Sequence, residues 1–154
     1  MKTSVLSAIA LLTLAPAAHA QQQGPGSIAA AVLNGYVRQD ITLIAPFSND
    51  TNARFFADLL AGRENPSALF DGTRGAAGTG WDGKTLPARY DEQGHAIVPF
   101  AIEGPGGPVS LGSGVQGRYM AIVLTLDSPQ DTSWGFEDIN YIARADYAAM
   151  RPAR

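Results

Sequence analysis

The chain of 154 residues contains no cysteine, and this absence excludes several kinds of site. Without thiols there is no disulfide, no cysteine nucleophile, no thiolate zinc site and no iron–sulfur cluster. Histidine is also scarce, because His19 and His95 are the two copies, and His19 lies in a segment that we expect to be removed. A zinc site with two histidines is therefore excluded, and a Ser-His-Asp arrangement would have to use His95.

Charged residues make up 16% of the chain, and the formal net charge is −3. This slightly acidic balance disfavours nucleic acid and anionic lipid as partners. A hydrophobic content of 45% disfavours a disordered chain. No apolar run reaches the roughly 20 residues that a transmembrane helix needs. We therefore expect no membrane span.

The first 20 residues, MKTSVLSAIALLTLAPAAHA, have the pattern of a secretory signal peptide. Lys2 supplies the positive charge, a short apolar stretch follows, and Ala18 and Ala20 form an A-x-A cleavage site. The alternative is a buried N-terminal helix. We expect export to the periplasm or the extracellular space. The expected parts are a signal peptide at 1–20, a flexible leader at 21–26, one domain at 27–147 and a tail at 148–154.

Short β-type segments separated by Gly- and Pro-rich turns dominate the remaining chain. The strongest is 118–126 (RYMAIVLTL), in which Ile122 and Leu124 should face the core. Further candidate strands are 41–47, 97–103, 109–111 and 136–143. The pattern predicts an all-β fold, an antiparallel β-sandwich of jelly-roll type with one short helix near residues 51–61. An α/β arrangement that starts at 41–47 is the alternative.

Four sequence pieces carry a resemblance to a known family. They are ALFDG at 68–72, TGW at 79–81, RYM at 118–120 and WGFEDI at 134–139. In this order they resemble discoidin and related galactose-binding-like jelly-roll domains. The resemblance is partial, because the segment between Asp71 and Arg118 is shorter than in a full discoidin domain and the family's W-x-x-V-D-L strand is not recognisable.

The resemblance implies a structural Ca²⁺ between the loop and the last strand. Asp71 and Thr79 would be ligands, together with Asp138 or, in its place, Glu137. Calcium takes six to eight oxygen ligands, which carboxylates and the carbonyls of a Gly-rich loop can supply. The alternative is that Asp71 caps an ordinary Asp-Gly turn and the acidic side chains face solvent.

Aromatic side chains are the candidate ligand-binding residues. Trp134, Tyr90 and Trp81 could offer flat faces to the apolar C–H faces of a sugar ring. The alternative is that these rings pack into the core or anchor a turn.

A catalytic interpretation finds little support in the residues. His95 follows the turn-like sequence DEQG, where we expect an exposed turn histidine, and no G-x-S-x-G elbow is present. We therefore do not expect an enzyme. The sequence favours an exported, non-catalytic β-sandwich that binds a glycan or a cell-envelope polymer. The alternatives are a structural or protein-interaction module of the envelope and a small secreted hydrolase.

Overall fold

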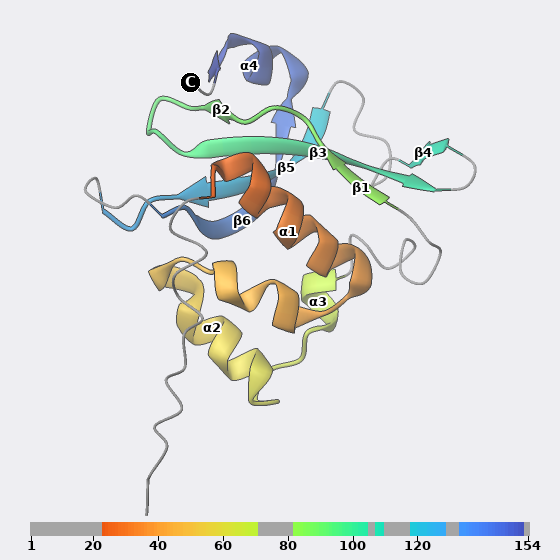
Figure 1. Ribbon diagram of the computed structural model, residues 1–154, viewed down its shortest axis with the longest axis vertical. Coiled ribbons are helices and arrows are strands. Elements are labelled where there is room, and N and C mark those ends of the chain that lie inside the picture. Colours follow the sequence, from red (N-terminus) through yellow and green to blue (C-terminus); the bar gives the residue numbers. More distant parts are fainter. Residues whose placement is uncertain (1–22, 71–81, 105–106, 110–117, 129–132, 153–154) are drawn as a thin grey trace, which may run out of the picture.

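The computed structural model describes residues 23–70, 82–104, 107–109, 118–128 and 133–152 (Figure 1). Helices come first in the chain: α1 (Pro25–Arg38), the 3-10 turns η2 (Ile41–Leu43) and η3 (Ala45–Phe47), α2 (Asp50–Leu60) and α3 (Ser67–Phe70). Strands follow, with one further helix: β1 (Asp82–Thr85), β2 (Arg89–Tyr90), β3 (Ala96–Gly104), β4 (Gly107–Val109), β5 (Arg118–Thr125), β6 (Gly135–Ala143), α4 (Arg144–Ala149) and β7 (Arg151–Pro152).

The strands form one seven-stranded antiparallel sheet in the order β6-β5-β3-β2-β7, with β1 and β4 also paired to β3. Strand β3 is central, because β2 and β1 follow one of its edges while β5 and β4 follow the other. The sheet is open, with β6 and β7 at its two ends. The prediction of antiparallel strands is confirmed. The prediction of an all-β sandwich is wrong, because helices pack on a single sheet in a mixed helix-and-sheet fold.

Helix α1 is the main element that the sequence analysis did not predict. It begins at Pro25, a residue suited to the first helical turn because its missing N–H is not needed there. Its apolar residues recur at helical spacing and are buried: Ile28, Ala29, Val32, Leu33 and Tyr36. Ala29 and the buried Gly35 are small, and the exposed Ala30 is also apolar, so the apolar face is less obvious in the sequence than a face of Leu and Ile would be.

Residues 41–47 form two 3-10 turns rather than the predicted strand. Asp40 starts the first turn, because its carboxylate accepts hydrogen bonds from the Thr42 backbone N–H (2.9 Å) and hydroxyl (2.6 Å). The hydroxyl and then the backbone hydrogen bond lower the pKa of Asp40 below its usual range. Local side-chain bonds of this kind compete with strand pairing and here outweigh the β-branched composition.

The core lies between the helices and one face of the sheet. Figure 1 shows α1, α2 and α3 on one side of the sheet and α4 on the other. Ile122 and Leu124 of β5 are fully buried, as predicted. The predicted helix near 51–61 is α2, and its Phe56 and Leu59 are buried. On the other face, a smaller cluster comprises Ile97, Ala121 and Val123, with Ile142 and Met150 packed against it.

The C-terminal part of the chain is held to the sheet by Arg89 of β2. Its Nη1 donates to three carbonyls at the end of α4, those of Tyr147 (3.2 Å), Ala148 (2.6 Å) and Met150 (3.4 Å). The guanidinium carbon also lies 4.7 Å from the centre of the Tyr147 ring. The segment expected as a tail thus begins inside α4 and includes β7.

Within the described chain, no helix has the length and apolar character needed to cross a membrane.

Candidate functional site

A small polar pocket of about 290 Å³ lies where the start of α2 meets the sheet. Its lining comes from four separate parts of the chain: the N-terminus of α2, the turn before β3, the end of β5 and the start of β6. We call it the polar pocket, and it is lined by Asn49, Thr51, His95, Thr125, Leu126, Asp127 and Glu137.

A β-bulge in β6 places Glu137 at this pocket. Val123 pairs with Asp138 and Leu124 pairs with Phe136, so Glu137 is the extra residue between the two pairs. A bulge bends its strand and redirects a side chain, and bulges are frequent beside functional sites. The bulge therefore gives Glu137 an orientation that regular pairing would not.

Asn49 holds this carboxylate in place. It is the N-cap of α2, its Oδ1 accepting from the Asn52 backbone N–H (3.0 Å). Its Nδ2 donates to the Thr125 hydroxyl (3.0 Å) and to the Glu137 carboxylate. The side chain is 3% exposed, so it is a buried polar group with every atom paired. One residue thus fixes the helix terminus and the bulge together.

Two further contacts join α2 to the sheet. Asn52 Nδ2 donates to the backbone carbonyls of Glu137 (2.5 Å) and Phe136 (3.3 Å). Gly135 allows the close approach of the two segments, because a Cβ there would lie 2.6 Å from the Asn49 Cβ and 2.7 Å from its Cα. On the other wall of the pocket, the Asp127 carboxylate accepts from the Asp50 backbone N–H (3.0 Å).

His95 completes the pocket and is paired with Asp91. The Asp91 carboxylate accepts from the His95 backbone N–H (2.8 Å) and lies 2.9 Å from Nδ1. The His95 side chain is 42% exposed, consistent with the expected turn position. With Nδ1–H donated to Asp91, Nε2 is an acceptor in the neutral ring and a donor in the protonated ring.

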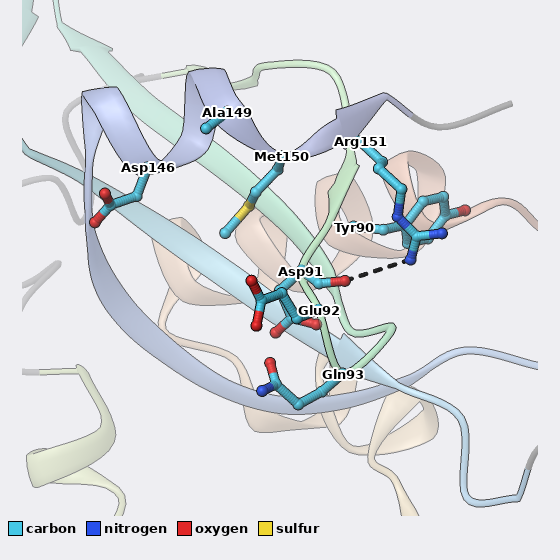
Figure 2. A pocket seen from close by; sticks show the side chains of 8 residues that line it. All are labelled: Tyr90, Asp91, Glu92, Gln93, Asp146, Ala149, Met150 and Arg151. Carbon is cyan, nitrogen blue, oxygen red and sulfur yellow. Dashed lines mark hydrogen bonds between the residues drawn. The ribbon is translucent and has the colours of Figure 1, made fainter.

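A second pocket, of about 470 Å³, lies between the β2–β3 turn and the end of α4 (Figure 2). We call it the acidic pocket, and it is lined by Tyr90, Asp91, Glu92, Gln93, Asp146, Ala149, Met150 and Arg151. In Figure 2 the Met150 side chain points toward the Asp91 and Glu92 side chains, and Arg151 Nη2 donates to the Asp91 carbonyl (3.5 Å). Asp91 lies between the two pockets, since its carboxylate binds His95.

The predicted aromatic residues are only partly brought together. Tyr90 and Trp134 stack, with ring centres 5.6 Å apart and planes inclined by 24°. Both are half-buried and pack against the core, and Tyr90 also lines the acidic pocket. Trp81 lies outside the described residues. Each ring therefore covers one face of the other, and a sugar would have to contact an outer face of the pair.

The predicted calcium ligands are divided between described and undescribed parts of the chain. Asp71 and Thr79 lie outside the described residues. Glu137 faces the polar pocket, and Asp138 is exposed, with its carboxylate accepting from the Ile139 N–H (2.7 Å). Among the described residues, no group of three or more His, Asp or Glu side chains could hold a metal ion. Calcium stays a prediction, and the single open sheet removes the jelly-roll geometry that suggested it.

A third cavity, of about 130 Å³, lies between α1, α2 and β6 and is lined by Tyr36, Asn52, Phe55, Phe56, Leu69, Phe136, Glu137 and Asp138. Burial raises the pKa of the Tyr36 phenol far above its usual value, and the nearby Asp138 carboxylate raises it further. The ring also makes edge contacts with Phe70 and Phe136, with centres 5.8 and 6.0 Å away. Tyr36 is best explained as part of the core.

Glu137 is a possible ligand residue on the sequence alone, but nothing in the sequence connects it with Asn49. The missing signal was the bulge, which no local pattern in 136–143 indicates. A comparison with known proteins gives no family for the chain, because no protein-family model, curated protein or solved structure matches it. The function must therefore be argued from the pockets.

Proposed function

We propose that the protein is an exported, non-catalytic binding module whose ligand is a glycan or another cell-envelope polymer, held at the polar pocket. The observation that carries this proposal is the Glu137 carboxylate, fixed at a bulge by the buried Asn49 amide. A prepositioned carboxylate in a small concave site is suited to accepting hydrogen bonds from ligand hydroxyls.

The surrounding groups support a polyhydroxylated ligand. Thr51 and Thr125 provide hydroxyls, Asp127 provides a further acceptor, and His95 provides a ring nitrogen. Trp134 directly precedes β6, whose first residue pairs with Thr125, so the stacked rings lie at the same end of the sheet as the pocket. Fixed polar groups close to an aromatic surface are a combination that matches the alternating polar and apolar faces of a sugar.

Binding is favoured over catalysis because the pocket carboxylates already have fixed structural partners. Glu137 accepts from the Asn49 amide, and Asp127 accepts from the backbone at the start of α2. Both are thereby held as hydrogen-bond acceptors. The sequence also offers no G-x-S-x-G nucleophile elbow for His95 to activate.

The test is a glycan and envelope-polymer binding screen with the purified exported protein, followed by calorimetry. Glu137→Gln keeps the shape and an acceptor oxygen but removes the charge, so we expect at least about tenfold weaker binding, which corresponds to about 1.4 kcal/mol. Glu64→Gln, at an exposed carboxylate outside the pocket, is the matched control and should bind normally. Binding to no sugar or polymer, or equal binding by both variants, would contradict the proposal.

Export and the aromatic contribution have their own tests. N-terminal sequencing of the secreted protein should begin at Gln21, and a product that retains Met1 would contradict export by cleavage. Trp134→Ala should weaken glycan binding if an outer ring face contacts the sugar. Its far-UV circular dichroism must match that of the wild type, because Trp134 also packs against the core.

A protein-interaction module is the second candidate, and one observation favours it. Phe55 and Leu60 of α2 are 43% and 51% exposed, so this helix presents large apolar side chains to solvent. Recovery of one specific envelope protein in a pull-down, lost in Phe55→Ser, would favour this candidate, provided that no sugar binds.

A further inference from the structure

The hydrogen-bonding capacity of the polar pocket restricts which glycan it can accept. Both amide hydrogens of Asn49 are used, one toward Thr125 and one toward Glu137, and its oxygen is used by the Asn52 N–H. Asn49 therefore shapes the pocket but has no donor left for a ligand.

The groups that remain free are mainly acceptors. The Glu137 and Asp127 carboxylates each retain an oxygen that is not used in these contacts. Since the Thr125 oxygen already accepts from Asn49, its O–H and that of Thr51 are the donors available among the lining side chains.

The charges of the pocket and the capped N-terminus of α2 also argue against an anionic ligand. Among the described residues that line the pocket there is no Lys or Arg, whereas there are two carboxylates. The N-terminus of α2, which would otherwise attract an anion, is already capped: the Asp50 N–H is taken by Asp127 and the Asn52 N–H by Asn49. A uronic acid or a sulfated sugar would bring negative charge to groups that repel it.

On the basis of the proposed function, we infer that the polar pocket binds an amine-bearing sugar, with the ammonium between Glu137 and Asp127. An ammonium supplies three donors and a positive charge, which matches two carboxylates. The amide of an N-acetylated sugar supplies one donor and no charge.

The test compares three oligosaccharides of equal length by calorimetry at a slightly acidic pH at which the amine is protonated. The probes are glucosamine, N-acetylglucosamine and galacturonic acid oligomers. We expect the glucosamine oligomer to bind at least about tenfold more tightly than the N-acetylated one, a difference of about 1.4 kcal/mol. We expect the uronic acid oligomer to bind more weakly than both.

Four variants locate the effect. Asp127→Asn and Glu137→Gln retain acceptor oxygens for their structural contacts but lose charge, so each should reduce the preference for the amine to below about threefold. Glu64→Gln, at an exposed position, and Glu92→Gln, in the acidic pocket, should leave most of the preference intact. A larger effect of Glu92→Gln than of Glu137→Gln would overturn the assignment to the polar pocket.

The remaining outcomes separate this inference from the proposed function. Equal binding of the amine and the N-acetylated sugar, or a preference for the uronic acid, would overturn the inference while the binding function stands. Binding of none of the three, together with no binding in the wider screen, would overturn the proposed function itself.

Discussion

The link between α2 and the bulge can be tested by replacing Asn49 with serine. Serine is as good an N-cap as asparagine, so Asn49→Ser retains the hydrogen bond to the Asn52 N–H. What it removes is the amide that donates to Glu137 and Thr125. The substitution therefore separates the contribution of the sheet contacts from that of the helix cap.

The expected loss follows from the two bonds removed. A hydrogen bond to a charged group contributes about 1.5–3 kcal/mol and one to a neutral group about 0.5–1.5 kcal/mol. Water can enter the open pocket and solvate Glu137 in part, so we expect the lower half of the sum, about 2–3 kcal/mol. Urea unfolding followed by circular dichroism measures this as a lower midpoint at an unchanged slope.

A matched control is available at Asn65. Its side chain also caps a helix, accepting from the Ser67 N–H (2.9 Å), but it is exposed and makes no tertiary contact among the hydrogen bonds of the described chain. Asn65→Ser should change the free energy of unfolding by less than about 0.5 kcal/mol. If Asn49→Ser cost no more than this control, the amide would not be holding the bulge, and the argument for a prepositioned Glu137 would fail.

Four further results are expected. Gly135→Ala should cost about 1–3 kcal/mol in urea unfolding, because its Cβ would meet the backbone at the N-cap of α2. Gly26→Ala, with open space around the new Cβ, should be neutral or stabilising. Leu124→Ala should cost about 2–5 kcal/mol in the same assay, and a loss below about 1 kcal/mol would contradict its core position. Burial raises the pKa of Tyr36, so its contribution to the free energy of unfolding is complete below the ordinary tyrosine pKa of about 10. Above that pH the contribution falls by up to about 1.4 kcal/mol per pH unit. Tyr36→Phe should abolish this decline. Arg89→Gln should increase amide hydrogen exchange in α4 and β7 while leaving exchange in β5 unchanged.

The strands of the sheet were the most predictable part of the fold. Residues 118–126, 97–103 and 136–143 have the β-branched and aromatic content of buried strands, and each corresponds to a strand within a residue or two of its predicted limits. The helix near 51–61 has local signals, which are the Asn49 N-cap, apolar residues at helical spacing and Gly62 just after its end. The sequence therefore predicted the secondary structure correctly where the intrinsic preference of a segment agrees with its tertiary environment.

The errors arose where a segment's preference is weak or is overridden by one hydrogen-bonding side chain. The alanine-rich start of α1 has a diffuse apolar face, and its helical state is fixed by packing against the sheet. At 41–47 the Asp40 carboxylate redirects the backbone into 3-10 turns. One face of the sheet must be buried against another layer. Because these two helical segments were not predicted, a second sheet was expected to cover that face.

The candidate site was less predictable than the fold, because none of its decisive contacts is local. Asn49 reaches Thr125 and Glu137, which lie 76 and 88 positions further along the chain. The orientation of Glu137 also depends on a register shift that the amino-acid types in β6 do not indicate. The resemblance to discoidin-like domains implied Asp138 or, in its place, Glu137 as a calcium ligand. The bulge instead turns Glu137 to the polar pocket and leaves Asp138 exposed.

The same contacts explain why the pocket can be rigid although it is small and open. Two neighbouring amides, Asn49 and Asn52, each donate to two acceptors on the sheet. In return Asp127, two residues after β5, accepts from the Asp50 backbone N–H at the start of α2. Movement of α2 away from β6 would break all of these bonds together and expose buried polar groups, which is costly. A ligand therefore meets acceptors whose positions are already fixed, so little conformational entropy is lost on binding. The contacts that stabilise the junction of α2 with the sheet are the ones that orient the proposed binding groups.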